Sequence, residues 1–137
     1  MFSIEEDIAK DIVDWHKANM PNATLESQLL KLEEELEELS TAAKKVTDSK
    51  KCGAALQADL FEETADVLIC CIVLNLRYNS AIGATVANCV ASDADDEVKY
   101  LTLMAIAKKM IKNKARTWEE VKPGYYRHKE AEGGKSA

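Results

Sequence analysis

The sequence predicts an all-α protein, folded as one helical bundle of four to five helices. Three observations support this fold class: only 5 Gly and 2 Pro in 137 residues, apolar residues that recur at spacings of three and four, and a segment at 67–74 that is apolar on every side. Few turn-forming residues leave room for long helices, and the spacing of three and four marks one helical face. A helix that is apolar all round belongs in the centre of a bundle.

The first two helices have recognisable starts. Ser3 can cap a first helix, which is interrupted at Pro21 and carries an apolar stripe of Ile4, Ile8, Ile12 and Trp15. Thr24 can cap a second helix. The apolar residues of the second helix alternate at spacings of four and three over residues 25–46. This regular seam predicts a long amphipathic helix.

The later helices follow a polar connection at 47–53. A third helix is predicted over residues 54–79, and it contains the fully apolar segment. After it, Gly83 and an acidic run at 92–96 indicate a short helix and then a loop. A last helix is expected over about residues 95–113, where apolar residues recur at helical spacing.

The chain length allows one domain, which we place at residues 1–129. The polar, Gly-containing tail at 130–137 is expected to be disordered. The net charge of −6 argues against a nucleic-acid polymer as partner, because neutralising a phosphate backbone needs clustered Lys and Arg. A small anionic substrate remains compatible, since a metal ion can supply positive charge locally.

Several features predict a soluble, cytoplasmic protein. The N-terminal residues MFSIEEDIAK lack the apolar stretch of a signal peptide. The apolar run at 67–74 is too short for a bilayer, which takes about 20 residues, so no membrane partner is expected. The cysteines form no CxxC pair and are predicted to be reduced and in or near the core: Cys52, Cys70, Cys71 and Cys89.

Two short acidic patterns carry the candidate chemistry. Each places two carboxylates three residues apart, Glu35 and Glu38 on the second helix and Glu63 and Asp66 on the third. This spacing puts both side chains on one helix face. If the two helices pack antiparallel, the four carboxylates converge, and their repulsion is costly without a cation. Oxygen ligands with no soft-ligand cluster favour Mg²⁺, and Mn²⁺ can substitute for it.

Glu63 is the most informative of the four because it interrupts an apolar stripe made of Leu56, Leu60, Val67, Cys70 and Leu74. A buried carboxylate needs a partner, and a metal ion is a suitable one. The alternative for Glu63 and Asp66 is a solvated helix end. Glu35 and Glu38 indicate less by themselves, because a run of glutamates such as that at 33–38 is usually a solvated face.

The ordered combination of the two pairs resembles the MazG-like, all-α nucleoside triphosphate pyrophosphohydrolases, whose signature is ExxE on one helix and ExxD on the next. Residues 21–31 are similar to the approach to ExxE in small bacterial and phage members. A later segment is similar to the one that closes their catalytic core, through Lys109, Asn113, Arg116 and Trp118. The resemblance covers residues 4–118. Glu37 and Ala65 stand where relatives often have Gly, which affects helix packing rather than ligand positions.

The resemblance implies Mg²⁺-dependent hydrolysis of a nucleoside or deoxynucleoside triphosphate to the monophosphate and pyrophosphate. The metal ligands would be Glu35, Glu38, Glu63 and Asp66, and the catalytic carboxylates Glu34, Glu35 and Glu38. The phosphate-binding residues would be Lys109, Asn113 and Arg116. The base-binding residues would be Trp15, His16 and Asn19. Trp15 also continues the apolar stripe of the first helix, so simple packing explains it equally well.

Two other classes compete with this hypothesis. A non-enzymatic helical interaction module would use the leucine seam at 25–46 as a coiled coil, but the third helix lacks the polar face that such a coil needs. A di-iron carboxylate bundle wants Glu-x-x-His on two helices. The residues three positions before His16 and His128 are Val13 and Tyr125, so that motif does not occur.

The amount of apolar helix surface predicts self-association. The leucine seam and the central helix together present more apolar surface than one thin bundle covers. We therefore expect a homodimer that completes the bundle, or a tetramer, as the resemblance also implies.

Overall fold

The computed structural model describes residues 3–48, 53–79 and 96–129. Within them lie four helices and two strands: α1 (Ser3–Asn19), α2 (Leu25–Asp48), α3 (Ala54–Leu76), α5 (Asp96–Ala115), β1 (Trp118–Lys122) and β2 (Tyr125–His128). The mostly helical fold class is thus confirmed for this part of the chain. The short helix expected near Gly83, the acidic residues 92–95, the tail at 130–137, Cys52 and Cys89 lie outside the described residues.

The start of α2 is fixed by a reciprocal cap. The backbone N–H of Ser27 donates to Thr24 Oγ1 at 3.1 Å, and the backbone N–H of Thr24 donates to Ser27 Oγ at 2.8 Å. Two donors that the first helical turn leaves without partners are satisfied in this way. The predicted cap at Thr24 is therefore confirmed.

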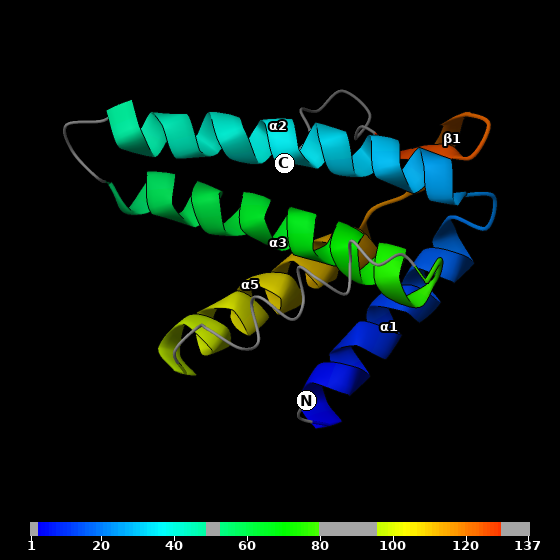
Figure 1. Cartoon of the computed structure of the whole chain (residues 1–137), viewed down its shortest axis with the longest axis horizontal. Helices are drawn as coiled ribbons and strands as arrows, with labels where there is room; N and C mark the ends of the chain where they lie inside the picture. The colour runs from blue at the N-terminus through cyan, green and yellow to red at the C-terminus, as the bar shows by residue number, and fades with distance from the viewer. Residues whose placement is uncertain (1–2, 49–52, 80–95, 130–137) are drawn as a thin grey trace.

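Helix α3 is the central element and packs against α1, α2 and α5. In Figure 1 it runs antiparallel to α2, while α1 and α5 cross it on its other side. Val73 and Leu74 are fully buried, as expected for a segment without a polar face. The helix ends at Leu76, three residues earlier than predicted, and Asn79 takes a left-handed backbone conformation with φ of 55°.

The core has two parts, one on each side of α3. Residues of α2 and α3 form the first, with Leu32, Val67, Cys71 and Leu74 among its members. The second lies between α1, α3, α5 and the hairpin and includes Ile12, Trp15, Ile69, Met110 and Tyr126. Cys70 and Cys71 are free, buried cysteines, as predicted.

The hairpin of β1 and β2 was not expected, because the prediction assigned no helix or strand to residues 118–128. The strands pair antiparallel, with an irregularity in register between Glu120 and Lys122. Gly124 forms the turn with φ of 76°, a conformation that glycine adopts without steric cost. Aromatic residues such as Tyr125 and Tyr126 also favour strands. The Pro-Gly pair at 123–124 was the available signal.

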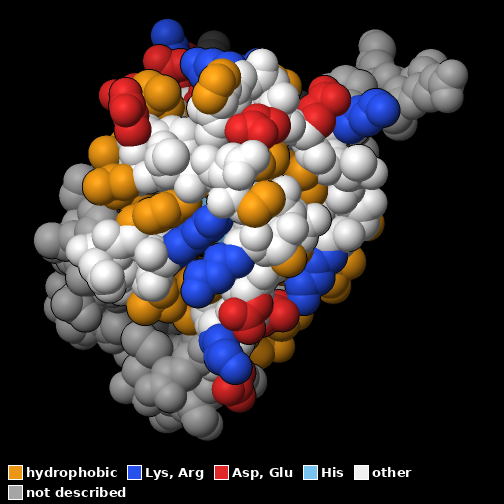
Figure 2. All heavy atoms as spheres, turned by 90° about the vertical axis from the view of Figure 1, so that its right-hand side faces the viewer, with side chains coloured by type: hydrophobic (Ala, Val, Ile, Leu, Met, Phe, Trp, Pro, Cys, Tyr) orange, Lys and Arg blue, Asp and Glu red, His pale blue; other side chains and the backbone are white. Residues whose placement is uncertain are grey.

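Charged side chains are mixed on the surface. On the face drawn in Figure 2, Lys and Arg lie among Asp, Glu and apolar side chains rather than in a patch of one sign. None of the described helices has an apolar stretch long enough to cross a membrane.

Candidate active site

The four predicted metal ligands meet between α2 and α3. One carboxylate oxygen from each of Glu35, Glu38, Glu63 and Asp66 can be chosen so that all lie within 4.8 Å of one another. The two helices run antiparallel (Figure 1), so a pair spaced by three residues on one helix faces the pair on the other. We call these four residues the carboxylate cluster.

Glu35 is the most buried member of the carboxylate cluster. It is 7% exposed, and its Oε2 has no hydrogen-bond partner among the described residues. Burial, followed by the negative charge of Asp66, raises the pKa of Glu35 to about 7. Lys31 opposes this shift from 3.4 Å away, without cancelling it. The positive charge near Glu35 is therefore too small to offset its burial and its repulsion by neighbouring carboxylates when it is ionised.

The members on α3 share this shortage of positive charge. Burial and then the charges of Asp66 and Glu38 raise the pKa of Glu63 to about 7, and Glu63 Oε2 also lacks a partner in the described structure. Burial raises the pKa of Asp66 as well, against the pull of Lys109. A divalent cation would supply the missing charge, and an all-oxygen ligand set suits Mg²⁺ or Mn²⁺. The residues present therefore fit such an ion.

Glu62 shows by contrast what a compensated carboxylate looks like here. Its Oε1 accepts hydrogen bonds from Lys112 Nζ at 2.8 Å and Lys109 Nζ at 3.1 Å. The bond from Lys112 is the main reason that the pKa of Glu62 lies below its ordinary value. Glu62 thus already contacts two lysines, whereas Oε2 of its neighbour Glu63 has no hydrogen-bond partner in the part of the chain that the structure describes.

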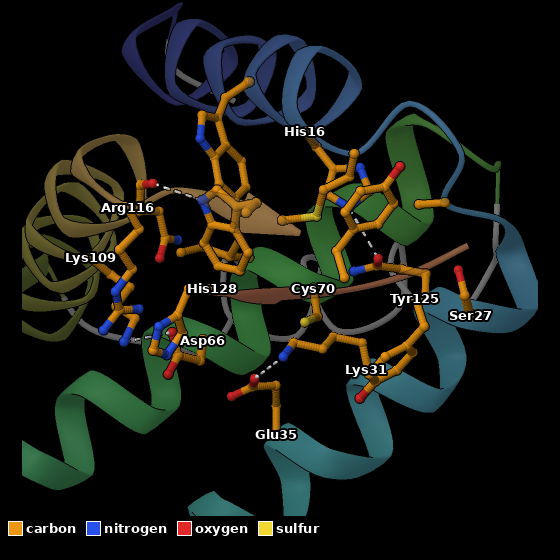
Figure 3. A pocket seen from close by; sticks show the side chains of 18 of the residues that line it. His16, Ser27, Lys31, Glu35, Asp66, Cys70, Lys109, Arg116, Tyr125 and His128 are labelled. Carbon is orange, nitrogen blue, oxygen red and sulfur yellow. Dashed lines mark hydrogen bonds and ion pairs between the residues drawn. The ribbon is translucent and has the colours of Figure 1, made fainter. Parts of the chain in front are cut away.

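The carboxylate cluster opens into a pocket of about 360 Å³ that all four described helices and the hairpin line. Figure 3 shows that Glu35 and Asp66 lie at one end of this pocket and His16 at the other. The first end is acidic. Away from that end, apolar and aromatic residues such as Met20, Ile69, Trp118 and Tyr126 line the pocket together with polar and basic ones. The pocket thus combines an acidic end with a surface suited to a flat apolar group.

The predicted phosphate-binding residues come together at this pocket. Lys109, Asn113 and Arg116 all line it. Lys109 is buried, and its Nζ lies 3.3 Å from Asp66 Oδ1, so it borders the carboxylate cluster directly. The backbone oxygen of Asn113 accepts a hydrogen bond from the indole N–H of Trp118 at 3.0 Å. This bond ties the end of α5 to the start of the hairpin.

The predicted base-binding residues are only partly brought together. Trp15 and His16 are buried and line the pocket. Trp15 packs edge-on against Trp118, with ring centroids 5.5 Å apart. Asn19 is exposed and is not among the lining residues; its side chain donates to the backbone oxygen of Trp15 at 2.9 Å.

Glu34, one of the three predicted catalytic carboxylates, lies apart from the other two. Its Oε1 accepts a hydrogen bond from Arg127 of β2 at 3.0 Å, and it does not line the pocket. Glu35 and Glu38 do line it. Of the three, the geometry therefore places Glu35 and Glu38 where a substrate would lie.

Sequence reasoning missed several pocket residues. Gly124, Tyr125, Tyr126 and His128 come from the hairpin, which was not predicted. Lys31 also lines the pocket; it forms an ion pair with Glu35, and its ammonium group lies 6.0 Å from the ring centroid of Tyr125. Its position four residues before Glu35 was the available signal, because that spacing places both on one helix face.

No family model, curated protein or solved structure matches the chain.

Proposed function

We propose that the protein is a Mg²⁺-dependent nucleoside triphosphate pyrophosphohydrolase, which converts a nucleoside or deoxynucleoside triphosphate to the monophosphate and pyrophosphate. The observation that carries this proposal is the pairing of the carboxylate cluster with an aromatic surface in one pocket. A nucleoside triphosphate has the matching chemistry, with metal-binding phosphates at one end and a flat base at the other. The resemblance to MazG-like enzymes points the same way.

The carboxylate cluster would hold the metal ion through Glu35, Glu38, Glu63 and Asp66. When bound there, Mg²⁺ neutralises phosphate charge and polarises the phosphoryl group. Hydrolysis consumes one water and breaks the bond that links the α-phosphate to pyrophosphate, so a proton from that water must be accepted. Glu38 is the exposed member of the cluster. We therefore assign the water's proton to the Glu38 carboxylate.

The basic side of the pocket would position the polyphosphate. Lys109 of α5 carries positive charge into the pocket beside the carboxylate cluster, and Arg116, just after α5, also lines the pocket. Phosphate oxygens accept hydrogen bonds from ammonium and guanidinium groups strongly. Asn113 offers a neutral carboxamide in the same wall. Positioning and charge stabilisation of this kind supply most of the catalysis of phosphoryl transfer.

Three leucines of the seam pack within this chain, which argues against the non-enzymatic interaction module, whereas Leu25 and Leu36 are exposed. Leu32 is buried against α3, and Leu29 and Leu39 pack beside it. These side chains therefore serve the fold of this chain and are not free to form a coiled coil with another protein.

The activity can be tested with purified protein and a panel of ribo- and deoxyribonucleoside triphosphates. With Mg²⁺ or Mn²⁺ we expect equal amounts of monophosphate and pyrophosphate, and EDTA should abolish turnover. Release of orthophosphate alone would indicate a different phosphohydrolase, and full turnover in metal-free buffer would rule out this mechanism.

We further propose that the protein forms a homodimer or tetramer. Apolar side chains stay exposed on α3 and α5: Phe61 (41%), Tyr100 (62%), Leu101 (41%), Met104 (41%) and Ile111 (71%). Exposed apolar patches of this kind are typical of protein interfaces. Sedimentation at micromolar concentration should give a multiple of the 15.2 kDa chain mass. A mass of one chain would contradict this proposal and leave the proposed reaction untouched.

A further inference from the structure

A buried hydrogen-bonded chain crosses the end of the pocket opposite the carboxylate cluster. Arg77, just after α3, donates through Nη1 to His16 Nδ1 on α1 at 2.6 Å. His16 Nε2 lies 3.1 Å from Gln28 Oε1 on α2. His16 is 2% exposed and Gln28 is 5% exposed, and both line the pocket. Figure 3 shows the His16 contact as a dashed line.

The chemistry of Arg77 determines where the imidazole proton lies. A guanidinium group can only donate hydrogen bonds, so His16 Nδ1 must be the accepting nitrogen. His16 Nε2 then carries the proton and donates to Gln28 Oε1. Burial, and then the charge of Arg77, lower the pKa of His16 to about 4, which keeps the ring neutral near pH 7. Nδ1 of His16 therefore only accepts a hydrogen bond, and Nε2 only donates one.

Arg77 is itself held in place by the turn between α1 and α2. It donates to the backbone oxygens of Met20 at 3.0 Å and Pro21 at 3.2 Å. Next to it, the Tyr78 hydroxyl donates to the backbone oxygen of Ala23 at 2.7 Å. The Arg77 guanidinium is thus held by backbone oxygens rather than by mobile side chains. Its hydrogen bond to Nδ1 therefore fixes the orientation of the His16 ring.

The consequence falls on the Gln28 carboxamide. Its oxygen points to His16 and accepts the Nε2 proton, so the NH₂, which can only donate, is directed away from His16. Gln28 lies seven residues before Glu35 on α2, which is about 10 Å along the helix axis. A nucleotide whose phosphates lie at the carboxylate cluster would place its base at that distance. The base edge facing Gln28 would therefore meet a fixed donor.

We propose that Gln28 selects nucleobases that present a carbonyl oxygen, rather than an amino group, to α2, and that His16 is the positioning residue that orients the Gln28 carboxamide for this task. This inference rests on the proposed function for the placement of the phosphates. A base with an amino group at that edge would set two donors against each other, and such unpaired buried polar groups discriminate strongly between substrates.

Two matched pairs of bases test the selection. The members of each pair exchange a carbonyl oxygen for an amino group at one carbon, and the neighbouring ring nitrogen changes from an N–H donor to an acceptor. The pairs are hypoxanthine against adenine and uracil against cytosine. If the enzyme hydrolyses purine nucleotides, kcat/KM should be higher for hypoxanthine than for adenine by about tenfold or more. If it hydrolyses pyrimidine nucleotides, the same should hold for uracil over cytosine. An equal or better amino member would overturn the inference.

Variants at Gln28 test the residue directly. Gln28→Met keeps the length of the side chain and removes the donor, so the preference should fall to within about threefold. Gln28→Glu replaces the donor with an acceptor and should shift the preference toward the amino member. An unchanged ratio in both variants would overturn the role of Gln28. The substrate ratio is a readout that a merely structural residue would not move.

His16→Phe tests the positioning role. It removes the donor to Oε1, so the carboxamide can turn over, and the preference should weaken while Gln28 is intact. Lys17→Ala, an exposed change on the same helix, is the matched control and should leave the ratio unchanged. A folded His16→Phe protein with full preference would overturn this part. If His16→Phe does not fold, the milder His16→Gln, which keeps a donor, should fold and retain the preference, and a loss in that variant would overturn it.

Binding of monophosphates in the presence of Mg²⁺ separates this inference from the proposed function. Calorimetry with dUMP against dCMP, and dIMP against dAMP, needs no turnover. A preference of about tenfold for the carbonyl member that Gln28→Met removes supports the selection even if no triphosphate is hydrolysed, in which case the proposed reaction alone fails. Turnover of triphosphates without any such preference would overturn the selection and leave the reaction standing.

Discussion

Replacing Glu35 with glutamine should separate its chemistry from its structural role. Glu35→Gln keeps the shape of the side chain and removes the charge. Glu35 is 7% exposed, and its Oε2 has no hydrogen-bond partner among the described residues. If Glu35 is a metal ligand, its charge lowers the stability of the protein when no metal is bound. The variant should then be more stable than the parent in the absence of metal and should lose activity.

The size of the gain follows from the pKa. The fold raises the pKa of Glu35 from 4.5 to about 7, and each unit corresponds to about 1.4 kcal/mol, so ionising Glu35 costs the folded state about 3 kcal/mol. The glutamine amide must be buried and Lys31 loses its partner, which offsets part of this. We therefore expect a gain of about 1–3 kcal/mol at pH 8.

The gain should depend on pH in a defined direction. Below pH 4.5 the carboxyl is protonated in both the folded and unfolded states, so the charge has no effect. As pH rises from 4.5 to about 7, the unfolded chain releases its proton while the folded protein retains it, so the parent loses stability. Above about pH 7 the loss is complete. The difference between variant and parent should thus be small at pH 5 and largest at pH 8.

The assay is thermal or urea unfolding in EDTA at pH 5 and pH 8, together with turnover at saturating Mg²⁺. Glu33→Gln is the matched control, since it makes the same change at an exposed position on α2. Mg²⁺ should raise the melting temperature of the parent and of the control more than that of Glu35→Gln. A Glu35→Gln protein that is destabilised by about 3–5 kcal/mol yet fully active would refute the reasoning, because that result is typical of a broken structural ion pair.

Three further predictions concern the proposed phosphate site, the hairpin turn and the cap of α2. Lys109→Met should lower kcat/KM at least about tenfold in steady-state kinetics, because it removes the ammonium group beside Asp66 that we assign to phosphate; unchanged kinetics would contradict that role. Gly124→Ala should destabilise the protein by about 1–3 kcal/mol in urea unfolding, since φ is +76° and the new Cβ would lie 3.0 Å from the backbone oxygen of Asn22; an unaltered midpoint would show that the turn can adapt. Thr24→Ala should cost about 1 kcal/mol through the lost cap of α2, and Thr24→Ser, which keeps the hydroxyl, should restore most of it.

The sequence by itself indicated which elements form and which residues share a face. The helical bundle, the cap at Thr24 and the central place of α3 followed from local patterns, because helix pitch fixes which side chains lie together. The same pitch put Glu35 with Glu38 and Glu63 with Asp66, so only antiparallel packing of α2 and α3 was needed for the four to meet.

The hairpin was missed because its residues show no long periodic pattern. Two short strands, with an irregular register and a Pro-Gly turn, give a weak local signal. Tyr126 accepts a hydrogen bond from the backbone N–H of Asn22 at 3.2 Å, across 104 positions of sequence. The wall that the hairpin adds to the pocket therefore depends on tertiary contacts.

Only the tertiary structure decided which carboxylates are short of positive charge and how the far end of the pocket is organised. Glu62 and Glu63 are adjacent in sequence, yet Glu62 meets two lysines from α5, the nearer in sequence 47 positions away, while Glu63 keeps an oxygen without a partner. The His16 proton is likewise placed by Arg77, which is 61 positions away. Burial and charge compensation depend on neighbours that are distant along the chain, and no local spacing encodes them.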